Sequence, residues 1–152
     1  MNWLPHTTVA TLVVKDNRFL MVEEQSDHGF NVLNQPAGHL DANETLFEAA
    51  LRETLEETAW EVTLTGFLGT CLYKARNGVT YIRHSFLARP VQEHQLELDE
   101  GILRTHWLSD SEIRNHKIPA RSPMVVKVLD DYKSGRILPL DTLSHLAPYS
   151  EL

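Results

Sequence analysis

The residues of this chain that are best suited to carry out chemistry are glutamates between positions 44 and 57. Glu53, Glu56 and Glu57 stand at i, i+3 and i+4, which places their carboxylates on one side of an α-helix. Like charges at this spacing repel one another, and acidic residues near a helix C-terminus oppose its dipole. A divalent cation would offset both penalties, and hard oxygen ligands suit Mg²⁺ or Mn²⁺. The spacing favours a metal site, with a solvated acidic helix face as the alternative.

A helix must carry these carboxylates, and the sequence marks its start. Thr45 and Glu48 have the spacing of a capping box, and good helix formers continue to Glu57. The periodicity predicts one packing side, with the glutamates on the opposite side beside Ala49 and Ala50. The residues expected on the packing side are Phe47, Leu51, Thr54, Leu55 and Thr58.

The spacing of these residues resembles the Nudix box, G-x5-E-x7-R-E-U-x-E-E-x-G-U, where U is aliphatic or bulky; here it spans residues 38–60. Its fixed positions match at Gly38, Glu44, Arg52, Glu53, Glu56 and Glu57. Thr54, Ala59 and Trp60 depart from the pattern. Glycine at position 59 would cap the helix in a left-handed conformation. Alanine predicts either a strain of about 1 kcal/mol or a different exit from the helix.

The resemblance implies a set of roles for the box. Glu53, Glu56 and Glu57, together with the backbone carbonyl of Gly38, would hold Mg²⁺ or Mn²⁺. Arg52 would orient the carboxylates by ion pairing, and Glu44 would act beside it rather than on the metal.

The general base is assigned by the same resemblance. In relatives, a loop glutamate several residues before a tryptophan often binds metal or acts as the base. Glu100, seven residues before Trp107, is the best positional match, with Glu97 and Asp99 as competitors. Glu53 is the other candidate base, and a solvated acidic loop is the alternative interpretation. The predicted catalytic set is therefore Glu53, Arg52 and Glu100.

Further stretches resemble the NudJ-type phosphatase subgroup of the family; these are residues 5–10, 34–40, 121–123 and 132–140. This resemblance implies a broad phosphohydrolase that acts on nucleoside di- and triphosphates, hydroxymethylpyrimidine diphosphate and thiamine diphosphate. The proline that marks ADP-ribose-cleaving relatives, some fifteen residues beyond the box, is missing. Three alternatives stay open: a triphosphate pyrophosphatase that cleans the nucleotide pool, a non-catalytic nucleotide sensor, and a charged interaction surface on an unrelated protein.

Composition narrows the possible partners. A net charge of −7 argues against binding a nucleic-acid polymer and favours a metal wherever a phosphorylated metabolite or nucleotide must bind. No apolar run reaches the length of a membrane span, and the N-terminus lacks the build of a signal peptide. Cys71 is the only cysteine, which favours a reducing compartment, the cytoplasm. We expect a monomer or a small homo-oligomer.

Four cationic residues could contact phosphate oxygens: Lys74, Arg76, Arg83 and Arg121. Exposed salt-bridge partners are the ordinary interpretation of such residues. The sequence gives no reason to prefer one of the four.

The order of elements predicts the fold class. Strand patterns cover residues 7–14, 19–23, 31–33, 62–64, 67–73, 79–88 and 103–108, the sixth ending before Pro90. Helices open at Ser109 and at Ser122-Pro123. We expect one α/β domain over residues 1–152, a Nudix-type α/β/α sandwich with a mixed β-sheet between helices. Its C-terminal helix would span about 122–134, followed by a tail over 136–152.

Overall fold

A mixed sheet forms the framework of the molecule. The computed structural model describes residues 2–146. Within them the strands are β1 (His6–Lys15), β2 (Arg18–Gln25), β3 (Asn31–Asn34), β4 (Ala37–His39), β5 (Trp60–Lys74), β6 (Thr80–Glu93) and β7 (Ile102–Leu108). The helices are α1 (Leu46–Thr58), α2 (Asp110–Arg114) and α3 (Pro123–Lys133), with a 3-10 turn η1 at Leu140–Thr142.

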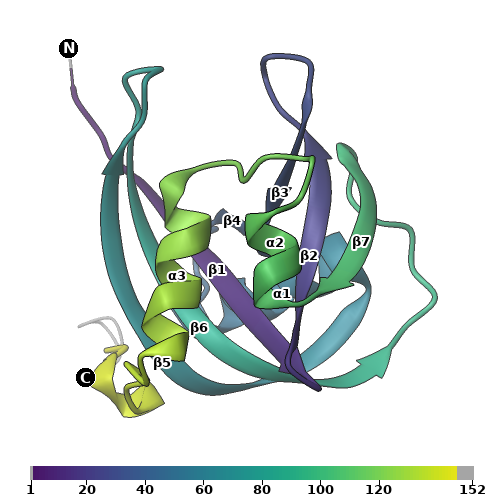
Figure 1. Ribbon diagram of the computed structural model, residues 1–152. Coiled ribbons are helices and arrows are strands. Elements are labelled where there is room, and N and C mark those ends of the chain that lie inside the picture. Colours follow the sequence, from purple (N-terminus) through teal and green to yellow (C-terminus); the bar gives the residue numbers. More distant parts are fainter. Residues whose placement is uncertain (1, 147–152) are drawn as a thin grey trace.

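The sheet has two halves that share β1. Its strand order is β3-β2-β1-β6-β5, with β4 paired to β1 and β7 paired to β2. The β1–β6 pair is parallel and the other pairs are antiparallel, so the predicted mixed sheet is confirmed. β1 and β2 pair only beside their turn, at Val14–Phe19 and Lys15–Arg18. Beyond that point the two halves diverge (Figure 1).

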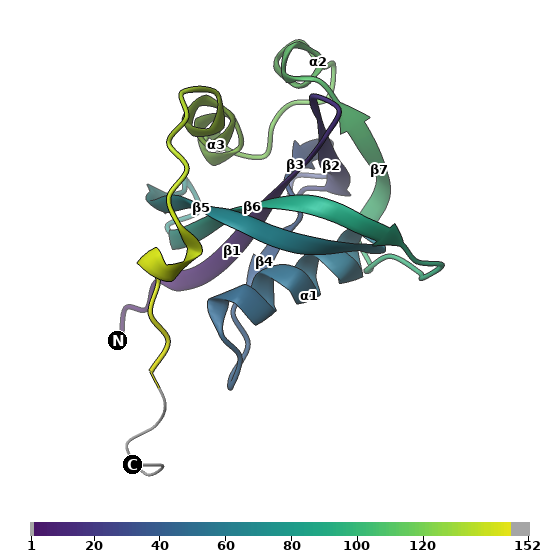
Figure 2. The same cartoon turned by 90° about the horizontal axis from the view of Figure 1, so that it is seen from below.

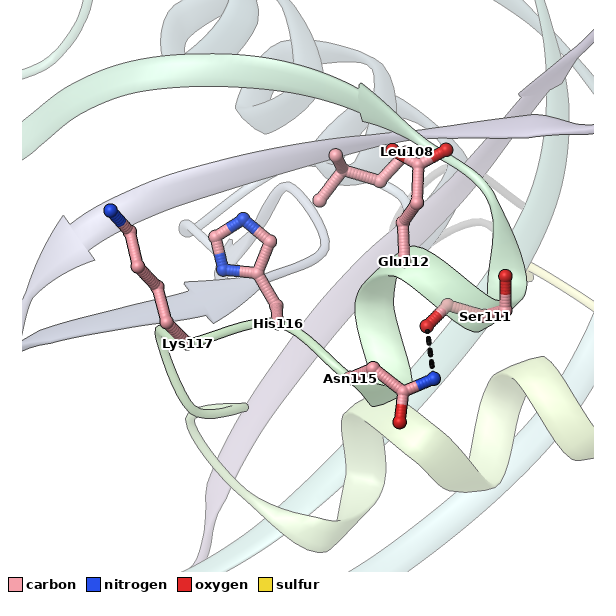
Figure 3. A pocket seen from close by; sticks show the side chains of 6 residues that line it. All are labelled: Leu108, Ser111, Glu112, Asn115, His116 and Lys117. Atoms are coloured by element: carbon pink, nitrogen blue, oxygen red, sulfur yellow. Dashed lines mark hydrogen bonds between the residues drawn. The ribbon is translucent and has the colours of Figure 1, made fainter.

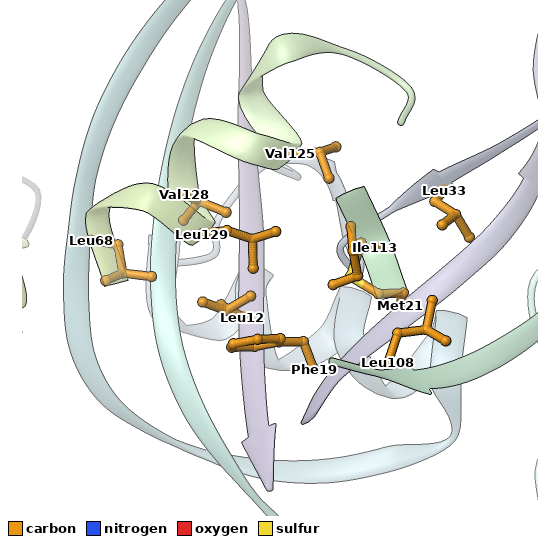
Figure 4. Packing of buried hydrophobic residues seen from close by; sticks show 10 residues of the cluster. All are labelled: Leu12, Phe19, Met21, Leu33, Leu68, Leu108, Ile113, Val125, Val128 and Leu129. Atoms are coloured by element: carbon orange, nitrogen blue, oxygen red, sulfur yellow. The ribbon is translucent and has the colours of Figure 1, made fainter. Parts of the chain in front are cut away.

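Helices cover both faces of the sheet. α1 lies on one face, and α2 and α3 lie on the other (Figure 2), which confirms the predicted sandwich. The larger apolar cluster fills the space under α2 and α3 (Figure 4). It contains Leu12, Phe19, Met21, Leu33, Leu68, Leu108, Ile113, Val125, Val128 and Leu129. A smaller cluster of Val9, Ala49, Ala50, Phe67 and Phe86 packs α1 against the sheet.

β6 runs further than its sequence indicates. The prediction that this strand ends before Pro90 is wrong, because β6 continues to Glu93 and pairs Pro90 with Val62 of β5. Proline disrupts a strand chiefly by removing a donor from the ladder. The parallel pairing of β1 with β6 ends at Val13–Ala88. Beyond Ala88 the strand has a partner on one side only, so a missing N–H is tolerated there.

The C-terminal part packs α3 onto the sheet. The Ser122 hydroxyl accepts a hydrogen bond from the Met124 N–H, and Pro123 opens the helix. Beyond it, Leu138 pairs with Phe67 of β5 through two backbone hydrogen bonds of 2.8 Å. Residues 147–152 of the expected tail lie outside the described residues. None of the helices within residues 2–146 is long and apolar enough to cross a membrane.

Candidate metal centre

α1 begins and ends on features that the sequence specifies. At its start the Thr45 hydroxyl accepts from the Glu48 N–H at 3.1 Å, and the Glu48 carboxylate accepts from the Thr45 N–H at 3.0 Å, so the predicted capping box is present. At its end Ala59 adopts φ 62° and ψ 11° and donates its N–H to Leu55. The alanine thus keeps the left-handed conformation that glycine would supply, at a strain of about 1 kcal/mol.

The packing side of α1 agrees with the predicted one only in part, because Thr54 and Thr58 are buried as expected but the two alanines and Glu57 are buried as well. The buried residues are Ala49, Ala50, Thr54, Glu57 and Thr58, whereas Leu51 of the predicted side is 38% exposed. The prediction counted apolar side chains, but the two alanines let the helix backbone lie close to the sheet. Glu53 and Glu57 consequently face β4, where they meet Gly38 and Ala37, whereas the Glu56 side chain is 41% exposed.

Glu57 is the most deeply buried of these carboxylates. It is 8% exposed, and its Oε1 accepts a hydrogen bond of 2.7 Å from the Ala37 N–H. Burial raises the pKa of Glu57 to about 9, and the negative charges of Glu24, Glu53 and Asp99 add to that effect. A cation beside this group would hold it ionised at neutral pH.

Three further carboxylates converge beside it. One oxygen each from Glu53, Glu56 and Asp99 lie within 4.8 Å of one another. The Asp99 N–H donates to the Glu56 carbonyl oxygen at 3.0 Å, which ties the loop after β6 to the end of α1. Burial also raises the pKa of the Glu53 carboxyl. Gly38 completes this arrangement, because a Cβ at that position would collide with the Glu53 carboxylate.

Arg52 binds the carboxylates together. Its guanidinium contacts Glu44 at 2.7 Å, Glu53 at 2.9 Å and Glu56 at 3.2 Å, and it also donates to the His39 carbonyl oxygen at 3.0 Å. The hydrogen bonds that Arg52 donates to the Glu44 carboxylate raise the pKa of Arg52 and lower the pKa of Glu44. One half-buried cation therefore fixes the positions of several acids, including Glu53.

The acid of the loop after β6 that meets the glutamates of α1 is not Glu100, the best positional match from the sequence, but Asp99. All three acids of this loop are exposed, but Asp99 belongs to the carboxylate cluster while Glu97 and Glu100 lie outside it. Sequence reasoning also missed Glu24, whose side chain is 13% exposed and whose charge acts on Glu57. The only available signal was a carboxylate at the end of an apolar strand.

A concave region lies away from the carboxylates of α1. It is formed by the end of β7, by α2 and by the residues that follow (Figure 3). Its lining residues are Leu108, Ser111, Glu112, Asn115, His116 and Lys117. α2 and α1 cover opposite faces of the sheet (Figure 2), so this hollow is separate from the carboxylates.

Comparisons with known proteins agree with this architecture. The chain matches the family model described as NUDIX domain over residues 4–128. Phosphatase NudJ of Escherichia coli strain K12 is 36% identical over 144 residues, which cover 91% of this chain and 90% of that protein. A NUDIX hydrolase from Nitrosomonas europaea has a TM-score of 0.90 at 36% identity, covering 94% of this chain and 98% of the other. A MutT NUDIX hydrolase from Burkholderia pseudomallei shares the fold at a TM-score of 0.70 and 18% identity, covering 84% and 98%.

Proposed function

We propose that this chain is a Mg²⁺-dependent phosphatase with the broad substrate range of the NudJ type. The premise is that the chain belongs to the Nudix family and is a hydrolase acting on phosphorus anhydrides. Its proposed substrates are nucleoside di- and triphosphates, hydroxymethylpyrimidine diphosphate and thiamine diphosphate. These are the substrates that the resemblance to NudJ-type phosphatases implies. The 36% sequence identity to proteins named Phosphatase NudJ supports them.

The observation that carries the metal dependence is the convergence of acids from two elements. Glu53 and Glu56 of α1 meet Asp99 of the loop after β6 within 4.8 Å, and the buried Glu57 lies on the same side of α1. Hard carboxylate oxygens fit Mg²⁺, or Mn²⁺ in its place. The raised pKa values of Glu53 and Glu57 reflect buried negative charge that a cation would stabilise.

We assign the metal to Glu53, Glu56 and Glu57, with the Gly38 carbonyl and Asp99 as further ligands. When bound, Mg²⁺ would neutralise diphosphate oxygens and lower the pKa of a coordinated water. Arg52 would hold the glutamates in place through its ion pairs.

The protein's own task is to position the diphosphate and a water molecule in line for attack on phosphorus. A carboxylate must accept the proton of that water. Glu100 is the candidate from the sequence, and Glu53 is the alternative within the box. Asp99, which the sequence already offered as a competitor of Glu100, is favoured by its position in the carboxylate cluster.

The remaining assignments are proposals of the same kind. We place the enzyme in the cytoplasm as a monomer or small homo-oligomer. Its partners would be small phosphorylated metabolites or nucleotides, without a nucleic-acid polymer or a membrane.

Release of phosphate and diphosphate from a substrate panel tests this function. The panel holds hydroxymethylpyrimidine diphosphate, thiamine diphosphate, common nucleoside di- and triphosphates, and ADP-ribose, each with Mg²⁺ and with EDTA. We expect turnover of the pyrimidine diphosphates and several nucleotides, abolished by EDTA. Cleavage of ADP-ribose alone would overturn the NudJ-type substrate range. Absence of turnover on the whole panel, with nucleotide-induced thermal stabilisation, would favour a sensor.

A further inference from the structure

A buried arginine lies near the carboxylates without an acidic partner. Arg83 of β6 is 4% exposed. Its Nη2 donates to the side-chain oxygens of Asn34 at 3.1 Å and Gln35 at 3.2 Å. Its Nε is buried and, within residues 2–146, has no hydrogen-bond partner. An unsatisfied buried donor is rare in folded proteins and requires an explanation.

Within residues 2–146 the charge of Arg83 also lacks a direct ion pair, although the more distant negative charges of Glu24 and Glu57 act on it. Within the described part of the chain, no carboxylate oxygen lies at ion-pair distance from the Arg83 guanidinium. Both of its hydrogen-bond partners are neutral amides. Burial lowers the pKa of Arg83 to about 10, so the guanidinium is still protonated at neutral pH. A buried cation without a paired anion is strongly destabilising. The sequence-based expectation of an exposed salt-bridge partner is therefore wrong for this residue.

A second arginine joins Arg83 through two polar side chains. Asn34 accepts from Arg83 with its amide oxygen and donates with its Nδ2 to Glu24 at 3.1 Å. Arg121, which precedes α3, contacts the same Glu24 oxygen at 3.0 Å, and its side chain is 41% exposed. The charge of Glu24 acts on both Arg83 and Glu57. Hydrogen bonds and an ion pair thus connect both guanidinium groups to Glu24, a carboxylate whose charge acts on Glu57 of the metal centre.

We propose that Arg83 and Arg121 form a phosphate-binding subsite. It binds those diphosphate oxygens of the substrate whose charge the metal ion does not neutralise. The inference rests on the proposed function, since it names a contact of the same substrate. A phosphate group provides the anionic acceptors that Arg83 lacks, and the planar guanidinium matches two phosphate oxygens at once. Arg121 is paired with Glu24, while the Nε of Arg83 is a donor without a partner among residues 2–146.

A purely structural role for Arg83 makes different predictions. In that case its hydrogen bonds to Asn34 and Gln35 would serve only to hold the segment that leads from β3 to β4. Replacement of Arg83 would then lower the melting temperature without a selective effect on anion binding. The affinity for a phosphate probe therefore separates the two roles.

The direct test is calorimetric titration of inorganic pyrophosphate into the full chain in buffer with EDTA, which removes any binding through a metal. We expect the wild type to bind, and Arg83→Met and Arg121→Met each to bind about 10- to 100-fold more weakly. Arg83→Lys, which keeps the charge but not the planar fork, should recover part of the lost affinity. Arg89→Met is the matched control, because Arg89 is an exposed residue of the same strand.

Three results would overturn the proposal: a wild type that does not bind pyrophosphate, arginine variants that bind as well as the wild type, or an equal loss in Arg89→Met. Arg121→Met guards against misfolding of the buried variant, since Arg121 is partly exposed. Melting temperatures of all variants are recorded alongside.

Kinetics in Mg²⁺ keep this test apart from that of the proposed function. We expect Arg83→Met to raise KM for a diphosphate substrate about 10- to 100-fold and to change kcat by a smaller factor. A wild type that binds pyrophosphate through Arg83 but hydrolyses nothing would refute the enzyme function and leave the subsite intact. An active wild type whose KM does not respond to either arginine variant would refute the subsite alone.

Discussion

Glu57→Gln should make the metal-free protein more stable at neutral pH while weakening its response to metal. Glu57 is 8% exposed, and burial raises its pKa from 4.5 to about 9. The folded protein therefore retains a proton that the unfolded chain releases between these two values. Stability consequently falls as pH rises through this window. Glutamine stays neutral and can keep the hydrogen bond from the Ala37 N–H.

The magnitude follows from the pKa difference. At pH 7 the pH is about 2.5 units above the pKa of 4.5 that the Glu57 carboxyl has in the unfolded chain. Each unit corresponds to about 1.4 kcal/mol. Because the folded protein keeps this proton at pH 7, its free energy of unfolding is about 3 kcal/mol lower there than under acidic conditions. Glu57→Gln avoids this cost, so its melting temperature at pH 7 should rise by about 5 to 10 °C in EDTA. Near pH 4.5 the two proteins should be almost equally stable.

Thermal unfolding in EDTA between pH 4.5 and 8, repeated with excess Mg²⁺, is the appropriate assay. In Mg²⁺ the wild type should gain more stability than Glu57→Gln, because the variant has lost a ligand charge. Glu93→Gln is the control, since Glu93 is exposed near the end of β6. A variant less stable than the wild type in EDTA at pH 7, or a difference that does not change with pH, would refute the raised pKa.

Other substitutions test the rest of the centre. Arg52→Ala should lower both Mg²⁺-dependent turnover and stability, the latter by about 1–3 kcal/mol, because several acids lose their shared cation; unchanged turnover and melting temperature would show that its ion pairs are incidental. Gly38→Ala should fold but lose most metal-dependent activity, because its Cβ displaces the Glu53 carboxylate; activity with Mg²⁺ and circular dichroism check this. Asp99→Asn should reduce Mg²⁺ affinity, measured by titration, more than Glu100→Gln does, because Asp99 lies in the cluster; the reverse order would return the ligand role to Glu100.

Features that depend on near neighbours in the chain were accessible from the sequence. The capping box at Thr45, the spacing of Glu53, Glu56 and Glu57, and the helix that starts at Pro123 all depend on residues within one or two turns. The order of the strand and helix patterns predicted a mixed sheet between helices, and the sheet has that form. Even the departure at Ala59 was visible, although the sequence left the backbone conformation open.

The tertiary structure decided which of these groups meet. The packing side of α1 depends on how closely Ala49 and Ala50 approach the sheet, and this contact has no local signature. Asp99 enters the cluster because the loop after β6 is bound to the Glu56 carbonyl oxygen, a contact between residues 43 positions apart. The burial of Arg83 likewise depends on Asn34 and Gln35, 49 and 48 positions away. Spacing along the chain thus specified the carboxylates of α1, while long-range packing selected their partners and set their pKa values.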